Sequence, residues 1–145
     1  LLLFGVLGHV PGRDGRREVL TALRQVLRPG GRIVLSVPNA HQRFRRERRE
    51  TAAMADRDGL EPGDIVYTRR HGGDDITLYY HLYDAPELEE ELRRCGFRPL
   101  DLHAESVLPE RAVVGSSLAA GLDRVLAAIA PLSRAYGFLA VAEAA

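Results

Sequence analysis

Hydrophobic and polar positions change from a helical to a strand period at a Pro-Gly-Gly turn, residues 29–31. Before the turn, apolar residues recur at helical spacing over 19–27, which predicts an amphipathic helix that begins with Asp14 as its N-cap. The turn ends that helix because proline disfavours helix in the residue before it. Residues 32–37 are then almost continuously apolar, as in a strand covered on both faces. The unit predicts a helix returning to a parallel strand of an α/β sheet.

The region 38–83 is the least regular part of the chain, and we interpret it as an insertion within one domain, residues 1–145. Turn signals at 61–64 and 71–75 enclose a short apolar segment. This pattern predicts a β-hairpin whose second strand lies near residues 76–80.

The C-terminal part opens with a helix signal, in which Asp84 is the N-cap and Glu87 takes the capping-box position. Gly96 is placed to end this helix at its C′ position. The remaining pattern predicts three more elements: a strand at Leu100–Ala104, a helix from Ser116 or Ser117 to Ala130, and a strand at Gly137–Ala142.

Composition narrows the functional classes. The 145 residues carry 20 basic and 20 acidic side chains, so no net charge draws the protein to nucleic acid or to an anionic membrane. A single cysteine, Cys95, excludes an internal disulfide and fits a reducing compartment, so we expect a cytoplasmic protein.

Several kinds of site are not indicated by the sequence. The five histidines have no metal-ligand spacing, and the chain has no nucleophile elbow and no phosphate-binding loop. Neither apolar stretch predicts a membrane span: Leu1–Leu7 is too short, and Ala112–Ala130 contains adjacent charges. We therefore expect no metal and no membrane partner.

The order of elements resembles a known enzyme family. The apolar run Leu1–Val10, the following helix and the sequence Leu-Arg-Pro-Gly-Gly at 27–31 are similar to the fourth-to-fifth strand region of class I S-adenosylmethionine-dependent methyltransferases. The helix that ends at Gly96-Phe97 resembles that family's approach to its sixth strand.

The resemblance implies an α/β fold, the second half of a Rossmann-like sheet with order 3-2-1-4-5-7-6. It maps Leu1–Phe4 to strand four, Arg32–Val37 to strand five, Leu100–Ala104 to strand six and Gly137–Ala142 to antiparallel strand seven. The first half, which binds the cofactor S-adenosylmethionine in that family, would be missing. Because the chain starts inside an apolar run, we expect a truncated domain that is inactive by itself.

The loop after the first strand is the predicted cofactor site. Ligands of open α/β sheets lie beyond the carboxyl ends of the strands. The resemblance places Phe4, Gly5, Leu7 and Gly8 there as cofactor-binding residues, with the glycines allowing close approach of a ligand. His9 follows as a catalytic candidate that orients the acceptor or takes a proton. The alternative is a histidine hydrogen-bonded to loop backbone.

Two further segments predict contacts with the methyl acceptor. Asn39 and His41 follow the strand at 32–37, although they also fit a capped turn. Residues 79–83 hold three tyrosines and a histidine, which form a candidate stacking wall: Tyr79, Tyr80 and Tyr83 as substrate-binding and His81 as catalytic. Alternation sends Tyr79, His81 and Tyr83 to one side and Tyr80 and Leu82 to the other. The alternative is that these rings pack the insertion onto the core.

A narrower resemblance concerns the acceptor. Gly63–Val66, Tyr79–Tyr83 and Glu105-Ser106 are similar to segments of tRNA wobble-uridine carboxymethyl methyltransferases. Tyr67-Thr68-Arg69 departs from the Pro-Trp expected there, and the C-terminal tail does not match. The acceptor is thus predicted to be a small molecule or a tRNA nucleoside.

The segment Arg43–Glu50 contains five arginines, and it is either a phosphate-contacting patch or a solvated helix face with internal charge pairs. This segment also supports an alternative to the enzyme, a non-catalytic methyltransferase-like module that binds a partner.

Overall fold

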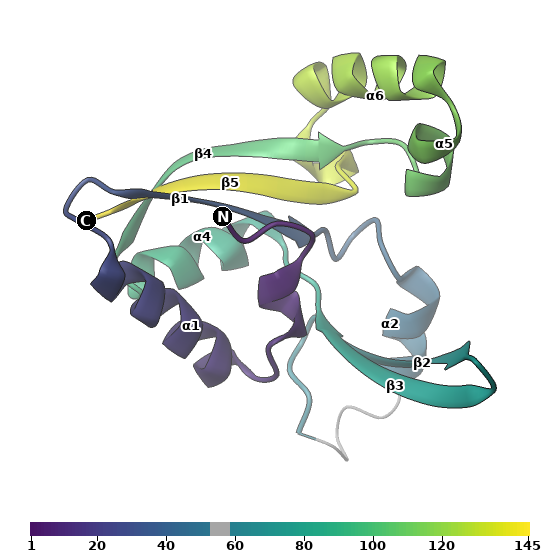
Figure 1. The fold of residues 1–145 in the computed structure, drawn as a ribbon, viewed down its shortest axis with the longest axis horizontal. Helices are drawn as coiled ribbons and strands as arrows, with labels where there is room; N and C mark the ends of the chain where they lie inside the picture. The colour runs from purple at the N-terminus through teal and green to yellow at the C-terminus, as the bar shows by residue number, and fades with distance from the viewer. Residues whose placement is uncertain (53–58) are drawn as a thin grey trace.

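The structure is a computed structural model, and it describes residues 1–52 and 59–145 (Figure 1). The elements are the helices α1 (Arg13–Val26), α2 (Arg45–Ala52), α4 (Ala85–Arg94), α5 (Glu110–Gly115) and α6 (Ser117–Ile129), the strands β1 (Arg32–Pro38), β2 (Asp64–His71), β3 (Asp74–His81), β4 (Phe97–Ser106) and β5 (Gly137–Ala144), and the 3₁₀ helices η1 (Val6–His9) and η2 (Leu132–Arg134). Each helix and strand expected after residue 12 is present, and several are longer than predicted.

The main sheet has the order β1-β5-β4, and β5 is antiparallel to both neighbours. The strand expected at Leu1–Phe4 is reduced to one parallel bridge between Leu2 and Leu35. In that bridge Leu2 N donates to Val34 O at 2.9 Å, and Leu2 O accepts from Ser36 N at 2.9 Å. The direction of this short segment agrees with the prediction, but its length does not.

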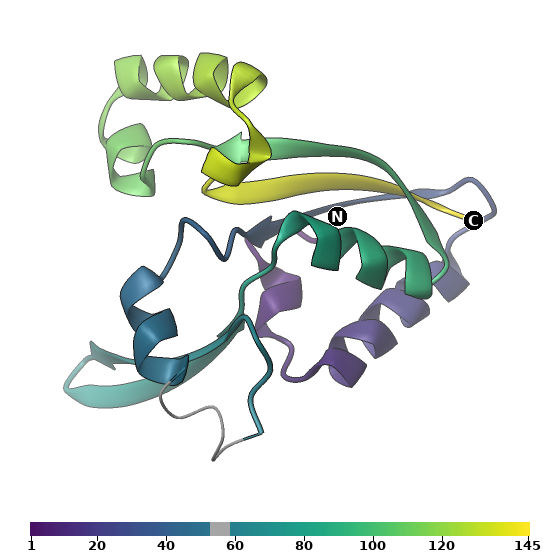
Figure 2. The same cartoon turned by 180° about the vertical axis from the view of Figure 1, so that it is seen from behind.

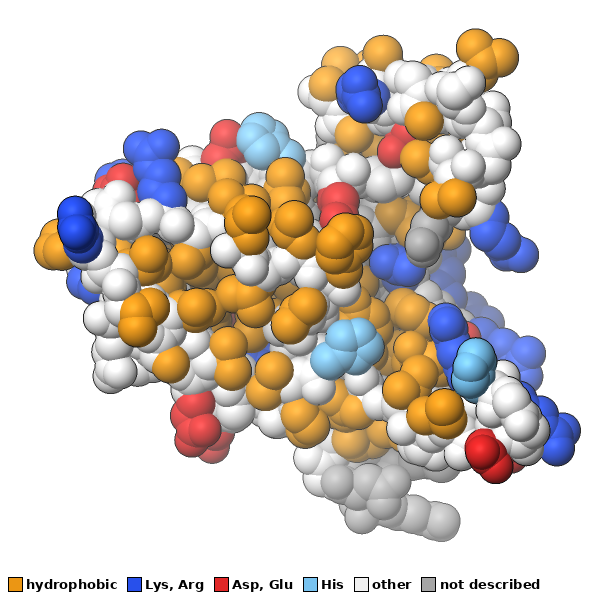
Figure 3. All heavy atoms as spheres, in the orientation of Figure 1, with side chains coloured by type: hydrophobic (Ala, Val, Ile, Leu, Met, Phe, Trp, Pro, Cys, Tyr) orange, Lys and Arg blue, Asp and Glu red, His pale blue; other side chains and the backbone are white. Residues whose placement is uncertain are grey.

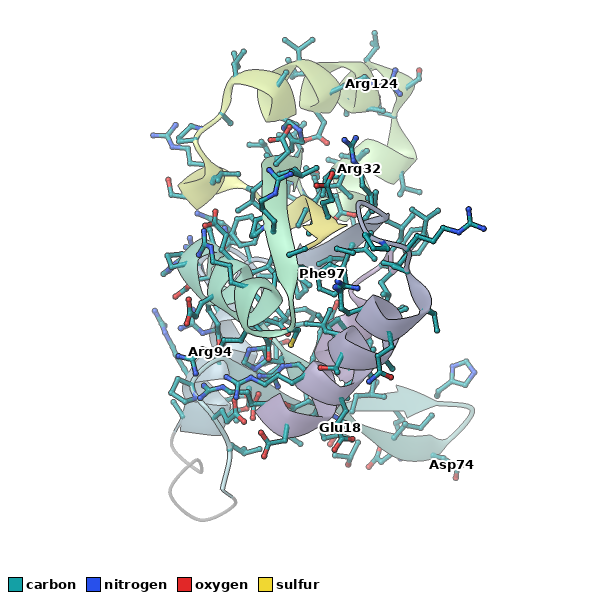
Figure 4. All side chains as sticks on the ribbon, turned by 90° about the vertical axis from the view of Figure 1, so that its left-hand side faces the viewer. Glu18, Arg32, Asp74, Arg94, Phe97 and Arg124 are labelled. Atoms are coloured by element: carbon teal, nitrogen blue, oxygen red, sulfur yellow. The ribbon has the colours of Figure 1, made fainter. Side chains whose placement is uncertain are left out.

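Helices lie on both sides of the main sheet. Helices α1 and α4 cover one face and α6 lies beyond the other, with the labelled Arg124 on α6 (Figure 4). The core between the sheet and α1 and α4 contains fully buried Leu20, Leu35 and Leu92, and Phe97 at the start of β4. Leu7 from η1 also belongs to this core, so hydrophobic burial anchors the turn that precedes α1.

Two helix starts illustrate local and distant capping. Asp84 caps α4 as predicted, since its Oδ1 accepts from Glu87 N at 2.8 Å. The prediction that Asp14 caps α1 is wrong: the N-cap is Gly12. The carboxylate of Glu61, distant in sequence, accepts from Arg13 N at 2.7 Å and so replaces a local cap.

The predicted hairpin is confirmed. Strands β2 and β3 pair antiparallel from Asp64 opposite His81 to His71 opposite Asp74, and they form a separate two-stranded sheet. A second, small core of four buried residues joins the hairpin to the segment after β1: Ala40, Ile65, Tyr80 and Leu82. Figure 1 shows the hairpin and α2 projecting together from the main sheet.

Helix α6 has an exposed apolar face. Leu118 and Ile129 are 85% and 76% exposed, whereas Asp123 is buried. Asp123 Oδ1 accepts from Val107 N at 2.8 Å and from Leu108 N at 2.7 Å, which ties α6 to the end of β4. No helix in the described part of the chain is long and apolar enough to cross a membrane.

Candidate functional site

A cavity of about 390 Å³ lies at the carboxyl ends of β1 and β4. This is the edge of an α/β sheet at which ligands are expected. Its lining includes the ends of both strands, the start of β5 and the turn before η1: Val37, Pro38, Glu105, Ser106, Gly137, Phe4 and Gly5. Tyr80 from the hairpin, Arg43, Asp123 and Tyr136 add further polar groups to the wall.

Tyr80 is the central aromatic side chain of this cavity. It is buried, and its ring stacks on His9 with centroids 4.2 Å apart and planes 4° from parallel. The ring of Phe44 meets it edge-on at 5.8 Å. These two rings fix the orientation of Tyr80.

Gly5 and Gly8 make room for Tyr80 rather than directly for a ligand. A Cβ on Gly5 would lie 1.7 Å from Tyr80 Oη, and one on Gly8 would lie 2.6 Å from Tyr80 Cε2 and from His81 O. The predicted close approach at both glycines is therefore real, but the group that approaches is a tyrosine ring.

Phe4 is held exposed at the cavity edge. Its backbone has φ 61°, a conformation that non-glycine residues rarely adopt, and its amide donates to Ser36 Oγ at 2.8 Å. The side chain is 88% exposed. The structure thus keeps Phe4 and Gly5 of the predicted cofactor loop at the cavity, whereas Leu7 lies in the core.

Electrostatics keep the Tyr80 hydroxyl protonated. Burial raises the pKa of Tyr80, and with the opposing effects of Arg43 and Glu105 the pKa reaches about 12. At neutral pH this hydroxyl is consequently a hydrogen-bond donor at the cavity wall. Arg43 and Glu105 line this cavity although no pattern in the sequence places them together.

His9 is hydrogen-bonded to backbone, as in the alternative stated above, although its partner lies on strand β3 and not in a loop. Its Nδ1 donates to Tyr79 O at 3.1 Å, and the ring is exposed. With Nδ1 protonated, the neutral ring keeps Nε2 as an acceptor. His9 therefore covers the face of Tyr80 and presents one basic nitrogen.

The other side of β3 forms a buried ion cluster, which comprises Arg16, Glu61, Asp64, Tyr79, His81, Tyr83 and Glu91. Asp64 Oδ1 accepts from Tyr79 Oη at 2.6 Å and from His81 Nδ1 at 2.6 Å. Tyr79, His81 and Tyr83 all join this cluster, while Tyr80 and Leu82 face the small core, so the predicted alternation is confirmed.

Within the cluster, the pKa values of Asp64 and His81 are shifted in opposite directions. Burial raises the pKa of Asp64, but the bonds from His81 and Tyr79 outweigh it and lower the pKa below its ordinary value. Burial lowers the pKa of His81, but the bond to Asp64 and the nearby Glu87 outweigh it and raise the pKa. His81 Nε2 lies 3.3 Å from Glu87 Oε1 without hydrogen-bond geometry. A fully buried ring between carboxylates favours a structural role for His81.

Arg16 is the cation that sequence reasoning missed. It is fully buried, lies 3.2 Å from Glu61 Oε2 and 3.7 Å from Glu91 Oε2, and sits over the ring of Tyr83 at 5.7 Å. Tyr83 Oη in turn donates to Glu91 Oε2 at 2.7 Å. Helical spacing contained the signal, because Arg16 lies four residues before the buried Leu20.

Asn39 and His41 separate. Asn39 is fully buried, and its amide donates to Ala135 O at 2.8 Å while its Oδ1 accepts from His41 N at 2.8 Å, as in a capped turn. His41 is exposed and lines a different groove. Neither side chain lines the cavity of Tyr80. Among the described residues no three His, Cys, Asp or Glu side chains are grouped so as to hold a metal ion.

No protein-family model matches the chain. Over 101 residues, 70% of this chain and 45% of the relative, it is 28% identical to a candidate methyltransferase of Encephalitozoon cuniculi. Its fold is similar to an S-adenosylmethionine-dependent methyltransferase from Methanosarcina mazei, with TM-score 0.66 and 16% identity, over 97% of this chain and 57% of that one.

Two further solved methyltransferase structures are also similar to this chain. The CcbJ methyltransferase of Streptomyces caelestis matches with TM-score 0.57 and 15% identity, over 99% of this chain and 58% of that one. The 1,6-didemethyltoxoflavin-N1-methyltransferase of Burkholderia thailandensis, solved with 1,6-didemethyltoxoflavin and S-adenosylhomocysteine, matches with TM-score 0.51 and 19% identity, over 99% and 42%. The chain therefore has a fold like that of S-adenosylmethionine-dependent methyltransferases and spans about half the length of these relatives.

Proposed function

We propose that this chain is the second half of a class I S-adenosylmethionine-dependent methyltransferase domain, and that the cavity at Tyr80 receives the methyl acceptor. The observation that carries the proposal is the position of this cavity, at the carboxyl ends of β1 and β4 and beside the Phe4–His9 turn. The similarity in fold to known methyltransferases supports it.

In this proposal the Leu2 segment is the family's strand four, β1 is strand five, β4 is strand six and β5 is strand seven. The parallel bridge from Leu2 to Leu35 and the antiparallel β5 between its neighbours support the assignment. Exposed apolar side chains on the N-terminal segment, Leu1, Phe4 and Val6, suit packing against further strands of the same domain. Hydrophobic side chains spread over that face in Figure 3.

S-adenosylmethionine, when bound, supplies an electrophilic methyl group. The described residues fit one side of a site for it, since the exposed ring of Phe4 and the backbone of Gly5 line the cavity edge. The protein's own contribution would be to position the acceptor in line with that methyl group and to exclude water. A base is needed only where the acceptor must lose a proton.

We assign the acceptor contacts to Tyr80, which lines the cavity, and to His9, which stacks on the ring of Tyr80 beside that lining. The Tyr80 hydroxyl donates a hydrogen bond, and His9 Nε2 is the nitrogen available to receive a proton from the acceptor. The flat stack of the two rings suits a planar acceptor group. His81, Tyr79 and Tyr83 would support Tyr80 from behind without touching the acceptor.

The acceptor is either a small molecule or a tRNA nucleoside. The two segments that resemble tRNA methyltransferases, Gly63–Val66 and Tyr79–Tyr83, meet where Asp64 binds Tyr79 and His81. A structural need therefore explains why they occur together, and their resemblance alone does not favour tRNA. The alternative of a non-catalytic module draws on the exposed apolar face of α6.

The test is binding of S-adenosylhomocysteine by the natural full-length protein, measured by isothermal titration calorimetry. We expect saturable binding that Phe4→Ala weakens at least about tenfold, since an aromatic contact is lost. The matched control is Ile76→Ala, an exposed apolar residue on the hairpin. A stably folded protein that binds no S-adenosylhomocysteine would overturn the proposal. Tyr80→Phe should leave this affinity unchanged and lower methyl transfer to the acceptor.

A further inference from the structure

A second concave surface lies beside α2, the helix that follows β1 in the chain. This groove, of about 750 Å³, is formed by one face of α2 and the loop 60–64. Its cationic side chains are His41, Arg45, Arg48 and Arg49. Arg45 and Arg48 (i, i+3) and Arg45 and Arg49 (i, i+4) are neighbours on the surface of α2, and His41 reaches the same groove from the segment before the helix. None of them lines the cavity of Tyr80.

The orientation of α2 is fixed at both ends. Phe44, just before the helix, packs on the rings of Tyr67 and Tyr80 with centroids 5.5 and 5.8 Å away. Near the other end, the buried Thr51 Oγ1 accepts from Val66 N at 3.1 Å. Figure 2 shows α2 lying against the β2–β3 hairpin, and its arginines line the groove together with the loop 60–64.

The arginines of this face have no counter-ion in the described part of the chain. Arg45 donates to His41 O and Gln42 Oε1, at 3.2 and 3.0 Å, and Arg48 donates to Ala40 O. All three acceptors are neutral. Arg49 has no carboxylate within salt-bridge distance among the described residues.

Arg46, on another face of the same helix, behaves differently, because its Nε lies 2.8 Å from Glu50 Oε1. The arginine-rich helix thus has one internally paired member and a face that is not paired. Among the described arginines of α2, a solvated face of charge pairs accounts for Arg46.

The carboxylates that line the groove already have partners inside the protein. Glu61 is held by Arg13 and Arg16, at 3.4 and 3.2 Å. Asp64 is held by His81 and by the hydroxyl of Tyr79. The field in the groove is therefore set by the unpaired guanidinium groups, which favour an anion.

We propose that the groove between α2 and the loop 60–64 binds phosphate groups through Arg45, Arg48 and Arg49. Guanidinium groups suit phosphate because they offer several coplanar donors, and three of them on one helix face can contact adjacent phosphates. The phosphates come from a free phosphorylated compound or from an RNA backbone. This inference does not depend on methyl transfer.

The experiment measures binding of pyrophosphate by calorimetry and of a fluorescent single-stranded RNA by anisotropy, with the natural protein and no S-adenosylmethionine. Arg45→Gln/Arg49→Gln should weaken binding of the preferred probe at least about tenfold, and for RNA should lower the slope of log K against log salt by about 1.4. Arg46→Gln, the matched control, should change affinity less than about twofold, since its charge is already paired.

The two probes distinguish the sources. Tight pyrophosphate binding that RNA does not improve indicates a free phosphorylated ligand, and RNA binding that far exceeds pyrophosphate indicates a nucleic-acid backbone. Unchanged binding in the double variant, equal weakening by Arg46→Gln, or no saturable binding of either probe would overturn the proposal. Since all the substituted side chains are exposed, equal thermal midpoints verify that the variants remain folded.

Discussion

Consecutive side chains from Tyr79 to Tyr83, at the end of β3 and just after it, contact two regions that differ in almost every physical respect. On one side Tyr80 borders a cavity and stacks on an exposed histidine. On the other side Tyr79, His81 and Tyr83 are bonded to carboxylates in the buried ion cluster. The comparison teaches that a cluster of aromatic and titratable residues in sequence can be divided by strand alternation into one reactive and one supporting half.

The largest effect is expected at Asp64, the acceptor for both Tyr79 and His81. Asp64→Ala leaves the fully buried His81 ring and the Tyr79 hydroxyl without their carboxylate acceptor and should lower the free energy of unfolding by about 3–5 kcal/mol. Urea denaturation measures this loss. Asp75→Ala is the matched control, because Asp75 lies on the same hairpin, is 69% exposed and pairs with Arg70 at 3.8 Å. A similar loss for both variants would contradict a special role for the cluster.

The next test compares two tyrosine hydroxyls on opposite sides of the segment Tyr79–Tyr83. Tyr83→Phe removes a buried bond to Glu91, of 2.7 Å, and should cost about 1.5–3 kcal/mol of unfolding free energy. Tyr80→Phe should stay within about 0.5 kcal/mol, because its hydroxyl faces the cavity. If the order of the two losses were reversed, the division into reactive and supporting halves would be wrong.

Gly5 tests how tightly the cavity side is packed. Gly5→Ala forces a Cβ against Tyr80 and a side chain onto a φ of 70°, so we expect a loss of about 1–3 kcal/mol. In a Tyr80→Ala background the same substitution should cost less, because the collision is gone. A double-mutant cycle by thermal or urea unfolding measures the coupling, and strict additivity would disprove the contact.

The smallest effect is a pH dependence from His81. Its pKa is raised in the folded state, so its stabilisation is complete below the ordinary value of 6.5 and is lost as pH rises through the higher folded pKa. Asp64, with a lowered pKa, loses its contribution only in acid. Unfolding midpoints should therefore decrease from pH 6 toward alkaline pH in the wild type, and His81→Gln should flatten that decrease. An unchanged slope in this variant would place the titration elsewhere.

Much of the fold was predictable, because local physics determines it. The Pro-Gly-Gly turn, the cap at Asp84 and the period-2 hairpin each need only neighbouring residues. The predicted start of α1 was wrong because the carboxylate that caps this helix belongs to Glu61, which is distant in sequence and cannot be found from a local pattern.

The candidate site was less predictable than the fold. Leu7 was expected at the cofactor, but it turns into the core because η1 bends the chain directly after Gly5. Arg43 and Glu105 reach the cavity from segments that only the folded chain brings together. The polar residues of the buried ion cluster lie on otherwise apolar faces. Periodicity predicts that such positions face inward, but it does not predict whether a charged side chain there has a partner.

The position of β5 has a consequence for biosynthesis. This strand is the last segment of the described chain, yet it lies between β1 and β4 and is hydrogen-bonded to both. As the ribosome makes the chain, β1 and β4 emerge with facing edges that have no partner until residues 137–144 are made. The sheet is therefore completed only after residues 137–144 have been made, and the nascent chain passes through a stage at which unpaired strand edges favour chaperone binding or aggregation.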